Sequence, residues 1–477
     1  MKLPFLLLLA LALAGCATDA GPNSTNTAPA APPKSVSVTP DAELAAEIRN
    51  ETLRAWNGYK KYAWSHDVLH PLAKGHSDWY AEPLAISLID AYSTLKLMGF
   101  DEEAAQVETF VKDTMNLDRD SDVETFEVNI RILGGLMSMY EMTRDTGILR
   151  RAREFGDRMM PAFDTPSGLP TFAVNLKTGA TRGMSINSAE AGSYLIEMGI
   201  LSYYTGDPRY YQAAKRSTKV CFDGRSELGL VGQQLDVERG VYTDSVGHIG
   251  ACIDSYYEYL PKAYELFGDP ELKAMWDVHL AGIQEHIPTE DGDKLWYGYV
   301  NRFTGEKTWS RVTLWDAFLP GLLAYSGEIG AAKRSQRTWD WLWRKYGLEP
   351  TAYNWERDSV LDGAYDLNPE IIESAYYLSR ITGEPEWQEM VRHYWSSYRQ
   401  HCRNDVAFHK IRDVRTMEPQ DEMATFLFAE SLKYFYLTFS PEEEWQLENV
   451  VFSTEAHPFK KSSFQRELAA ERLGFSL

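Results

Sequence analysis

The chain is poor in cysteine and in basic residues. It has 4 cysteines in 477 residues, and only Cys221, Cys252 and Cys402 lie beyond the N-terminal region. An odd number of cysteines at wide spacing excludes a disulfide framework and a zinc-binding pattern. The 48 lysines and arginines are outnumbered by 69 acidic residues, which gives a net charge of −21. Because phosphate contacts need cationic side chains, we expect no nucleic-acid partner. The negative net charge is compatible with cation binding, although an acidic surface often serves only to keep a protein soluble.

Long apolar runs are lacking as well. Residues 6–13 form an apolar run that is too short to span a bilayer but suits a secretory signal. The Leu-Ala-Gly-Cys that ends at Cys16 resembles the lipobox of bacterial lipoproteins. This resemblance implies a lipoprotein signal peptide over 1–16 and a lipid anchor to a membrane through Cys16. Simple cleavage near Gly15, which would release a free secreted protein, is the alternative.

The expected location follows from the residue after that cysteine. Ala17 is not the aspartate that usually retains a lipoprotein in the inner membrane. We therefore expect the bacterial cell envelope, with the protein anchored at the outer membrane or on the periplasmic side. Residues 17–40 are rich in Pro, Ala, Ser, Thr and Asn with almost no apolar bulk, which predicts a disordered linker. Residues 41–477 then form one folded domain, and we expect a monomer.

Turns recur along this domain. A helix-like apolar run ends in a Gly or Pro turn at 7 places, spaced roughly 50–60 residues apart, near residues 101, 145, 205, 267, 327, 382 and 440. Gly ends a helix well, and Asp or Glu before Pro begins the next one. The runs before the turns (192–204 and 371–381) are more apolar than those after them (209–219 and 387–399). The pattern predicts an all-α fold with inner and outer rings, an (α/α)7 barrel. An open solenoid is the competing architecture.

Carboxylates lie where the predicted inner helices begin. Glu127 and Arg131 are four residues apart and share one helical face, which indicates either a surface ion pair or a functional pair. Asp254 opens an aromatic helix, as an N-cap or as a catalytic group at the barrel mouth. Glu370 and Glu373 follow Pro369 near a helix N-terminus, where the helix dipole stabilises carboxylates even without a function.

The segment 451–458, Val-Phe-Ser-Thr-Glu-Ala-His-Pro, alternates as a short strand would. Thr454 and Glu455 could bind a hard cation or could lie on a solvated edge. If this C-terminal strand, or a hairpin that contains it, plugs the barrel, it brings Glu455 together with the carboxylates of the inner helices. Several carboxylates in an aromatic cleft suit glycoside hydrolysis, in which one acid protonates the leaving oxygen and one base activates water.

These segments resemble class I α-1,2-mannosidases, glycoside hydrolase family 47, from about residue 55 to residue 458. The resemblance rests on the following segments: 55–64, 126–136 (Phe-Glu-Val-Asn-Ile-Arg-Ile-Leu-Gly-Gly-Leu), 163–170, 189–193 (Ala-Glu-Ala-Gly-Ser), 254–260 (Asp-Ser-Tyr-Tyr-Glu-Tyr-Leu), 318–321, 368–374 (Asn-Pro-Glu-Ile-Ile-Glu-Ser), 429–434 (Ala-Glu-Ser-Leu-Lys-Tyr) and 451–458.

The resemblance implies an (α/α)7 barrel and an inverting, calcium-dependent exo-mannosidase that removes terminal α-1,2-linked mannose from mannose-containing oligosaccharides. It implies Glu127 as the general acid acting through a water, Asp254 as its partner or as the alternative acid, and Glu370 as the base. Thr454 would be the direct protein ligand of Ca²⁺, through its hydroxyl and its carbonyl. The surrounding shell for substrate or for the waters of calcium would comprise Glu373, Glu455, Arg131 and Glu190.

The chain departs from the family pattern at three positions. Asn368 replaces the Arg of Arg-Pro-Glu, Leu314 replaces the His of His-Leu-x-Cys-Phe, and Ala424 replaces the Glu of Met-Glu-Ser-Phe. The nearby Glu422 would face elsewhere on a helix. We therefore expect the chemistry to survive while the sugar-contacting shell has changed. The alternatives are the same mechanism on another α-mannosidic linkage or sugar, and a non-hydrolytic glycan-binding lipoprotein.

Overall fold

The computed structural model of the protein describes residues 38–477. The expected signal peptide and the expected lipidated Cys16 lie outside the described residues, as does the predicted linker up to residue 37. Residues 38–41 have no regular structure, and the first helix, α1, begins at Ala42. In the part of the chain from residue 38 onward, no helix is long and apolar enough to cross a membrane.

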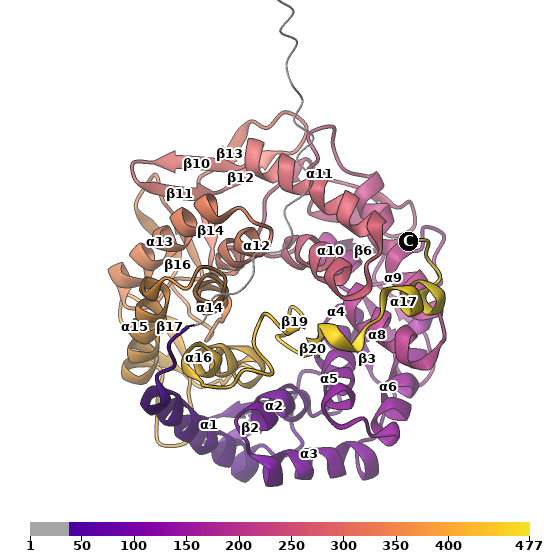
Figure 1. Ribbon diagram of the computed structural model, residues 1–477, viewed down its shortest axis with the longest axis horizontal. Helices are drawn as coiled ribbons and strands as arrows, with labels where there is room; N and C mark the ends of the chain where they lie inside the picture. The colour runs from indigo at the N-terminus through magenta and orange to yellow at the C-terminus, as the bar shows by residue number, and fades with distance from the viewer. Residues whose placement is uncertain (1–37) are drawn as a thin grey trace, which may run out of the picture.

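The helices form two concentric rings in Figure 1, as predicted for an (α/α)7 barrel. The inner ring consists of α2 (Ile86–Leu97), α5 (Gly134–Thr143), α8 (Leu195–Thr205), α10 (Asp254–Phe267), α12 (Leu319–Tyr325), α14 (Glu370–Thr382) and α16 (Leu432–Phe439). The outer ring consists of α1 (Ala42–Tyr62), α3 (Asp101–Asp113), α6 (Thr146–Met159), α9 (Arg209–Asp223), α11 (Pro270–His286), α13 (Ile329–Tyr346) and α15 (Pro385–His401).

The two rings differ in composition because they differ in burial. Inner helix α8 is buried over nearly its whole length and carries almost no charge. Outer helix α6 buries only one stripe, including Ile148, Ala152, Phe155 and Met159, at the spacing of a single helical face. This difference confirms the assignment of the more apolar runs to the inner ring.

The turns between the rings use the predicted chemistry. Gly268 ends α10 with a φ of 77°, a left-handed conformation that costs glycine little. The side chain of Asp269 then accepts a hydrogen bond from the backbone N–H of Glu271, and Pro270 occupies the first turn of α11. The Phe-Gly-Asp-Pro sequence thus ends an inner helix and starts the outer helix that packs on it.

The seventh turn differs from the prediction of a helical hairpin. After α16 the chain does not enter an outer helix at residue 440 but runs to the C-terminal hairpin. The outer helix that packs on α16 is α1, from the other end of the domain, and the backbone N–H of Asp41 donates to the carbonyl of Phe439 at 2.9 Å. The barrel is therefore closed by its first and last helices, which excludes the open solenoid.

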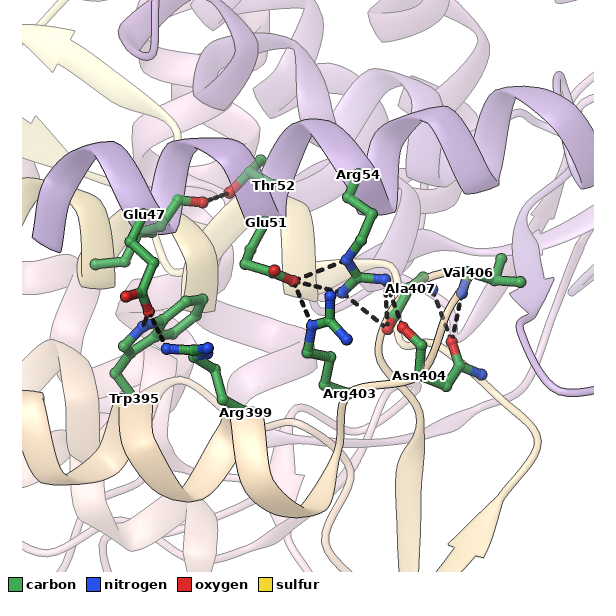
Figure 2. Close-up of polar contacts among 11 residues, drawn as sticks. Glu47, Glu51, Thr52, Arg54, Trp395, Arg399, Arg403, Asn404, Val406 and Ala407 are labelled. Carbon is green, nitrogen blue, oxygen red and sulfur yellow. Dashed lines mark hydrogen bonds and ion pairs between the residues drawn. The ribbon is translucent and has the colours of Figure 1, made fainter.

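Polar side chains seal this closure, as Figure 2 shows. Glu47 of α1 accepts hydrogen bonds from Trp395 (2.8 Å) and Arg399 (2.5 Å) of α15. Arg54 donates to the carbonyl of Asn404 at 2.6 Å and also reaches the carbonyl of Ala407. Figure 2 places these contacts along one face of α1, so that a single helix contacts both α15 and the loop after it.

Short antiparallel sheets connect outer helices to the next inner helices. Their strands are β1 (Val68–His70) with β2 (Gly75–Ser77); β3 (Asp122–Glu124), β4 (Ala173–Asn175) and β5 (Thr181–Arg182); β6 (Ser185–Asn187), β7 (Gln234–Asp236) and β8 (Val241–Tyr242); β9 (Val246–Gly247), β12 (Tyr299–Asn301) and β13 (Lys307–Trp309); β10 (Pro288–Asp291) with β11 (Lys294–Tyr297); β14 (Arg311–Thr313), β15 (Ala352–Asn354) and β16 (Ser359–Asp362); and β17 (Lys410–Asp413) with β18 (Glu418–Gln420).

Several inner helices are preceded by short helical segments. These are α4 (Thr125–Val128) with the π-helical turn η1 (Asn129–Leu133), α7 (Ser188–Gly192), η3 (Leu314–Phe318) and the π-helical turn η4 (Leu427–Ser431). Two further short segments are η2 (Met160–Phe163) and η5 (Lys461–Ser463), and the last helix, α17 (Arg466–Leu473), packs outside on α8.

A C-terminal hairpin, β19 (Val450–Phe452) with β20 (Pro458–Lys460), lies inside the ring in Figure 1, as predicted for the plug. The prediction that the strand continues through residues 453–456 is wrong. The backbone N–H of Ser453 donates to the carbonyl of His457 at 3.0 Å, and Ala456 has a φ of 50°. The chain therefore turns at residues 453–457, and Thr454 and Glu455 lie at the hairpin tip rather than on a strand.

Candidate active site

A cavity of ≈ 260 Å³ opens inside the ring, and all eight residues predicted for the site line it. Its walls carry many carboxylates but a single guanidinium, that of Arg131. The carboxylates belong to Glu124, Glu127, Glu190, Asp254, Glu258, Glu370, Glu373, Glu430 and Glu455. The aromatic rings of Phe126, Trp315, Phe318 and Phe426 line the same cavity. The structure therefore brings together side chains that are up to about 330 residues apart in sequence.

Glu127 and Arg131 form the predicted pair where the inner helix begins. Glu127 is in α4 and Arg131 is in η1, and the Arg131 Nε donates to Glu127 Oε2 at 2.8 Å. Arg131 also forms an ion pair with Glu455 and lies 3.5 Å from Asp90. Arg131 is only 8% exposed, so this is not a surface ion pair. Burial raises the pKa of Glu455 well above its usual range, and Arg131 offsets only part of that effect.

Asp254 is the first residue of α10. The backbone N–H of Ser255 donates to Asp254 Oδ1 at 2.8 Å. Burial raises the pKa of Asp254 to about 7, and the nearby carboxylate of Glu258 acts in the same direction. Glu258 lies one helical turn further along the same face and forms an ion pair with Lys262.

Glu370 and Glu373 lie in the first turn of α14, as predicted. Glu370 Oε1 accepts a hydrogen bond from Asn368 Nδ2 at 3.3 Å, while Oε2 is buried and has no partner among the described residues. Burial raises the pKa of Glu370 to about 8. Glu373 Oε1 accepts a hydrogen bond from Tyr434 at 3.1 Å, and burial raises the pKa of Glu373 although Lys262 opposes that shift.

The remaining two predicted residues have different surroundings. The backbone N–H of Thr454 donates to the hydroxyl of Tyr259 at 3.4 Å, which holds the hairpin tip against α10. Glu190 takes part in a capping box: its carboxylate accepts from the backbone N–H of Asn187, and the Asn187 side chain accepts from its own N–H, both at 2.8 Å. Glu190 therefore lines the cavity and also caps α7.

Sequence reasoning missed three carboxylates of the cavity wall, Glu124, Glu258 and Glu430. Glu258 could have been found from its spacing of four from Asp254 on one helix. Glu430 falls within the quoted segment 429–434, and burial raises its pKa well above the usual range. Its neighbour Lys433 is buried too, and burial lowers the Lys433 pKa to about 7.

Of the three departures from the family pattern, only Asn368 lines the cavity. Leu314 is completely buried in the core, and Ala424 is buried as well but does not line the cavity. Glu422 forms an ion pair with Lys410 at 2.6 Å and does not line the cavity, as expected, but it lies before the helix rather than on it.

The cavity suits a divalent cation because of its negative charge, although its acidic side chains do not form a preformed set of metal ligands. Within residues 38–477, no three His, Cys, Asp or Glu side chains are grouped to hold a metal by themselves. A calcium ion bound by one protein residue needs no such group, since Ca²⁺ takes about six to eight oxygens from hydroxyls, carbonyls and waters. The buried carboxylates outnumber the cavity's one guanidinium, and Glu370 has an oxygen without a partner. A dication would supply the missing positive charge.

Comparisons with known proteins bear on the same segments. Residues 51–461 match the model of glycosyl hydrolase family 47. Alpha-mannosidase I MNS5 of Arabidopsis thaliana is 33% identical, with 90% of this chain and 79% of that protein covered. Human ER degradation-enhancing alpha-mannosidase-like protein 2 is 32% identical, with 84% and 71% covered. The solved structure of an alpha-1,2-mannosidase from Trichoderma reesei superposes with a TM-score of 0.83 at 28% identity, covering 88% of this chain and 99% of that one.

The family match spans most of the residues that the structure describes, and it includes both the inner-ring carboxylates and the hairpin tip. The similarity to the Trichoderma structure extends over the whole barrel. The chain is therefore a glycoside hydrolase and belongs to glycosyl hydrolase family 47.

Proposed function

We propose that this protein is an inverting, calcium-dependent exo-α-mannosidase that hydrolyses terminal α-1,2-linked mannose. One observation carries the proposal: Glu127, Asp254, Glu370 and Thr454 line one acidic cavity in a family 47 barrel. The names of relatives support it, among them the mannosyl-oligosaccharide 1,2-alpha-mannosidase of Candida albicans, 28% identical over 471 residues.

Asp254 is the better placed proton donor. Its raised pKa of about 7 leaves a proton on the carboxyl near neutral pH, as a general acid requires. Glu127 is 2.8 Å from the Arg131 guanidinium, which holds it in an ion pair. We assign proton donation to Asp254 and assign to Glu127, with Arg131, the orientation of the leaving group or of a water beside it.

Glu370 is the proposed base that takes a proton from the attacking water. Its unpartnered Oε2 can accept that proton, and the hydrogen bond from Asn368 orients the carboxyl. A base must be ionised, whereas burial raises the pKa of Glu370 to about 8. Positive charge in the cavity would lower that pKa, which links the base to the proposed metal.

Thr454 would hold the calcium ion through its hydroxyl and its carbonyl, with Glu373 and Glu455 accepting hydrogen bonds from the waters of the ion. When bound, calcium supplies positive charge and can be coordinated by the oxygens of sugar hydroxyls. The tip geometry supports this role, because Ser453 and His457 close the turn that presents Thr454 to the cavity.

The test is hydrolysis of α-1,2-mannobiose followed by proton NMR. We expect β-mannose to appear first, loss of cleavage after chelation, and recovery with added Ca²⁺. Initial release of α-mannose would contradict inversion, and full activity in chelator would contradict the role of calcium. A Thr454→Val variant should need much more added Ca²⁺ than the unaltered protein.

Asn368 favours a second candidate, the same mechanism on another α-mannosidic linkage or another sugar. It replaces a cation that the family pattern places at the cavity, so sugar contacts there must differ. A panel of α-1,2-, α-1,3- and α-1,6-linked mannobioses separates the two candidates. If no disaccharide is cleaved but mannosides bind in calorimetry, the non-hydrolytic glycan-binding alternative holds.

We also propose, from the sequence alone, that Cys16 anchors the protein to a membrane of the bacterial cell envelope and that the protein is a monomer. Metabolic labelling with a palmitate analogue, compared between the natural sequence and Cys16→Ser, tests the anchor. Sedimentation velocity tests the oligomeric state.

A further inference from the structure

A second cavity, of ≈ 480 Å³, lies directly beside the acidic one. Ala251, Cys252 and Trp315 line both cavities and form their common wall. Cys252 has a φ of 81° and is only two residues from Asp254, the proposed proton donor. The second cavity therefore begins next to the group that would protonate the leaving oxygen.

The second cavity has an aromatic wall. The rings of Tyr299 and Trp309 lie 5.6 Å apart between centroids, and His248 stacks on Tyr299 at 4.3 Å. Tyr299 thus contacts both other rings, and Trp309 is 48% exposed. An exposed tryptophan at a cavity, held on the short strand β13 beside the stacked rings of His248 and Tyr299, offers a flat apolar surface to a ligand.

The only guanidinium that lines this cavity, Arg311, lacks a charged partner. It lies over the Trp309 ring at 4.8 Å and over Tyr299 at 6.0 Å. Its buried Nε has no hydrogen-bond partner among residues 38–477. The carboxyl of Asp316 is near enough to feel the charge of Arg311, but it already accepts hydrogen bonds from Thr313, so Arg311 has donors available for a ligand.

We propose that this second cavity is the subsite for the leaving saccharide, with Trp309 stacking on the sugar ring and Arg311 donating hydrogen bonds to its hydroxyls. Sugar rings have an apolar C–H face and a polar hydroxyl edge, which matches an aromatic surface flanked by Arg311, Gln233 and Thr308. An acyl chain or a bare phosphate would use only one of these two features. This inference rests on the proposed hydrolysis, because it assigns a leaving group to that reaction.

The test compares two substrates that differ only beyond the scissile bond. α-1,2-Mannotriose places sugars in the proposed subsite, whereas α-mannosyl fluoride places none there. We expect Trp309→Ala and Arg311→Met to lower kcat/KM for mannotriose about tenfold or more, mainly by raising KM, and to change kcat/KM for the fluoride less than about twofold. Equal losses on both substrates, or no loss on mannotriose, would overturn the assignment.

Trp341 provides the matched control. It is also an exposed tryptophan, at 36%, but it lies on outer helix α13 and lines neither cavity. Trp341→Ala should leave both rates unchanged.

If the unaltered protein hydrolyses neither substrate, calorimetry with mannotriose tests the subsite by binding. Binding weakened about tenfold by Trp309→Ala, and not by Trp341→Ala, supports the subsite although hydrolysis fails. Binding unaffected by Trp309→Ala overturns the subsite.

Discussion

Among residues 38–477, Asn368 is the one side chain that donates a hydrogen bond to Glu370. The hydrogen bond from Asn368 Nδ2 favours the ionised form of Glu370 and so lowers its pKa, against the larger effect of burial. In Asn368→Ala the carboxylate loses this donor, so the pKa of Glu370 rises. Because the base must be ionised, we expect the acidic limb of the pH profile of kcat/KM to move to higher pH. Ala424→Ser, buried away from the cavity wall, should leave that limb in place.

Glu370→Gln separates catalysis from folding. The substitution keeps the shape of the side chain but removes the proposed base, so we expect kcat to fall by roughly three orders of magnitude or more. Since Glu370 is a buried carboxyl without a charged partner, its neutral replacement should leave the thermal unfolding midpoint unchanged or raise it. Near-normal turnover would exclude Glu370 as the base, and a lower midpoint would contradict the account of its burial.

That the predicted site residues line one cavity could be inferred from the sequence, because each predicted carboxylate lies where an inner helix begins or at the plug. Their ionisation could not be predicted, since it depends on burial and on partners from distant segments. Arg131 is an example. Its spacing of four from Glu127 predicts their ion pair, but its contacts with Glu455 and Asp90 join residues that no local sequence pattern connects.

Among the helices, α10 and α11 are joined by a neutral histidine. His279 Nδ1 lies 2.6 Å from the carbonyl of Gly229, and Nε2 lies 2.9 Å from the hydroxyl of Tyr256. The first nitrogen can only donate to a carbonyl, so the second accepts from the tyrosine in the neutral ring. Burial lowers the pKa of His279 from 6.5 to about 4.

This histidine should make the pair of helices acid-sensitive. Between pH 6.5 and 4 the unfolded chain binds a proton at His279 while the folded protein does not, so the free energy of unfolding falls as the pH falls. The shift corresponds to about 3 kcal/mol at most. We expect His279→Gln to lose less thermal stability than the unaltered protein between pH 7 and pH 5. An identical loss in both proteins would contradict a neutral buried His279.

Among the secondary-structure elements, helices were easier to predict than strands. The inner and outer helices follow from apolar content and from capping residues such as Asp269 and Gly268. The segment 451–458 alternates like a strand throughout, yet β19 ends at Phe452. The turn that follows is closed by the contact between Ser453 and His457, and alternation carries no information about such a backbone contact.

For the whole molecule, the seam between α1 and α15 decides whether the ring stays closed. Arg54 donates to the backbone carbonyls of Asn404 and Ala407 beyond α15 and is half-buried. Removing it leaves the Asn404 carbonyl without a donor among residues 38–477, while the Ala407 carbonyl keeps the backbone N–H of Asn404. We expect Arg54→Ala to lower the free energy of unfolding by about 1–3 kcal/mol and to increase hydrogen exchange in α1. Arg399→Ala removes an exposed ion pair of the same seam and should cost less than about 0.5 kcal/mol. Equal effects of the two variants would contradict this account.

The number of helix pairs could be predicted from the turns, but not the way the ring closes. The seventh turn looks like the others in sequence, and only the structure shows that α1 takes the place of the missing outer helix.

This closure has a consequence for synthesis. The hydrogen bond that Arg403 donates to Glu51 joins residues 352 positions apart. Helix α1 therefore cannot make this contact until α15 and the loop after it have been synthesised. At ordinary elongation rates that delay is roughly 20–70 s. Throughout that time the nascent chain exposes the apolar faces of α1 and of the incomplete ring. A holdase that binds the emerging α1 should therefore raise the yield of active protein more than one that acts after release.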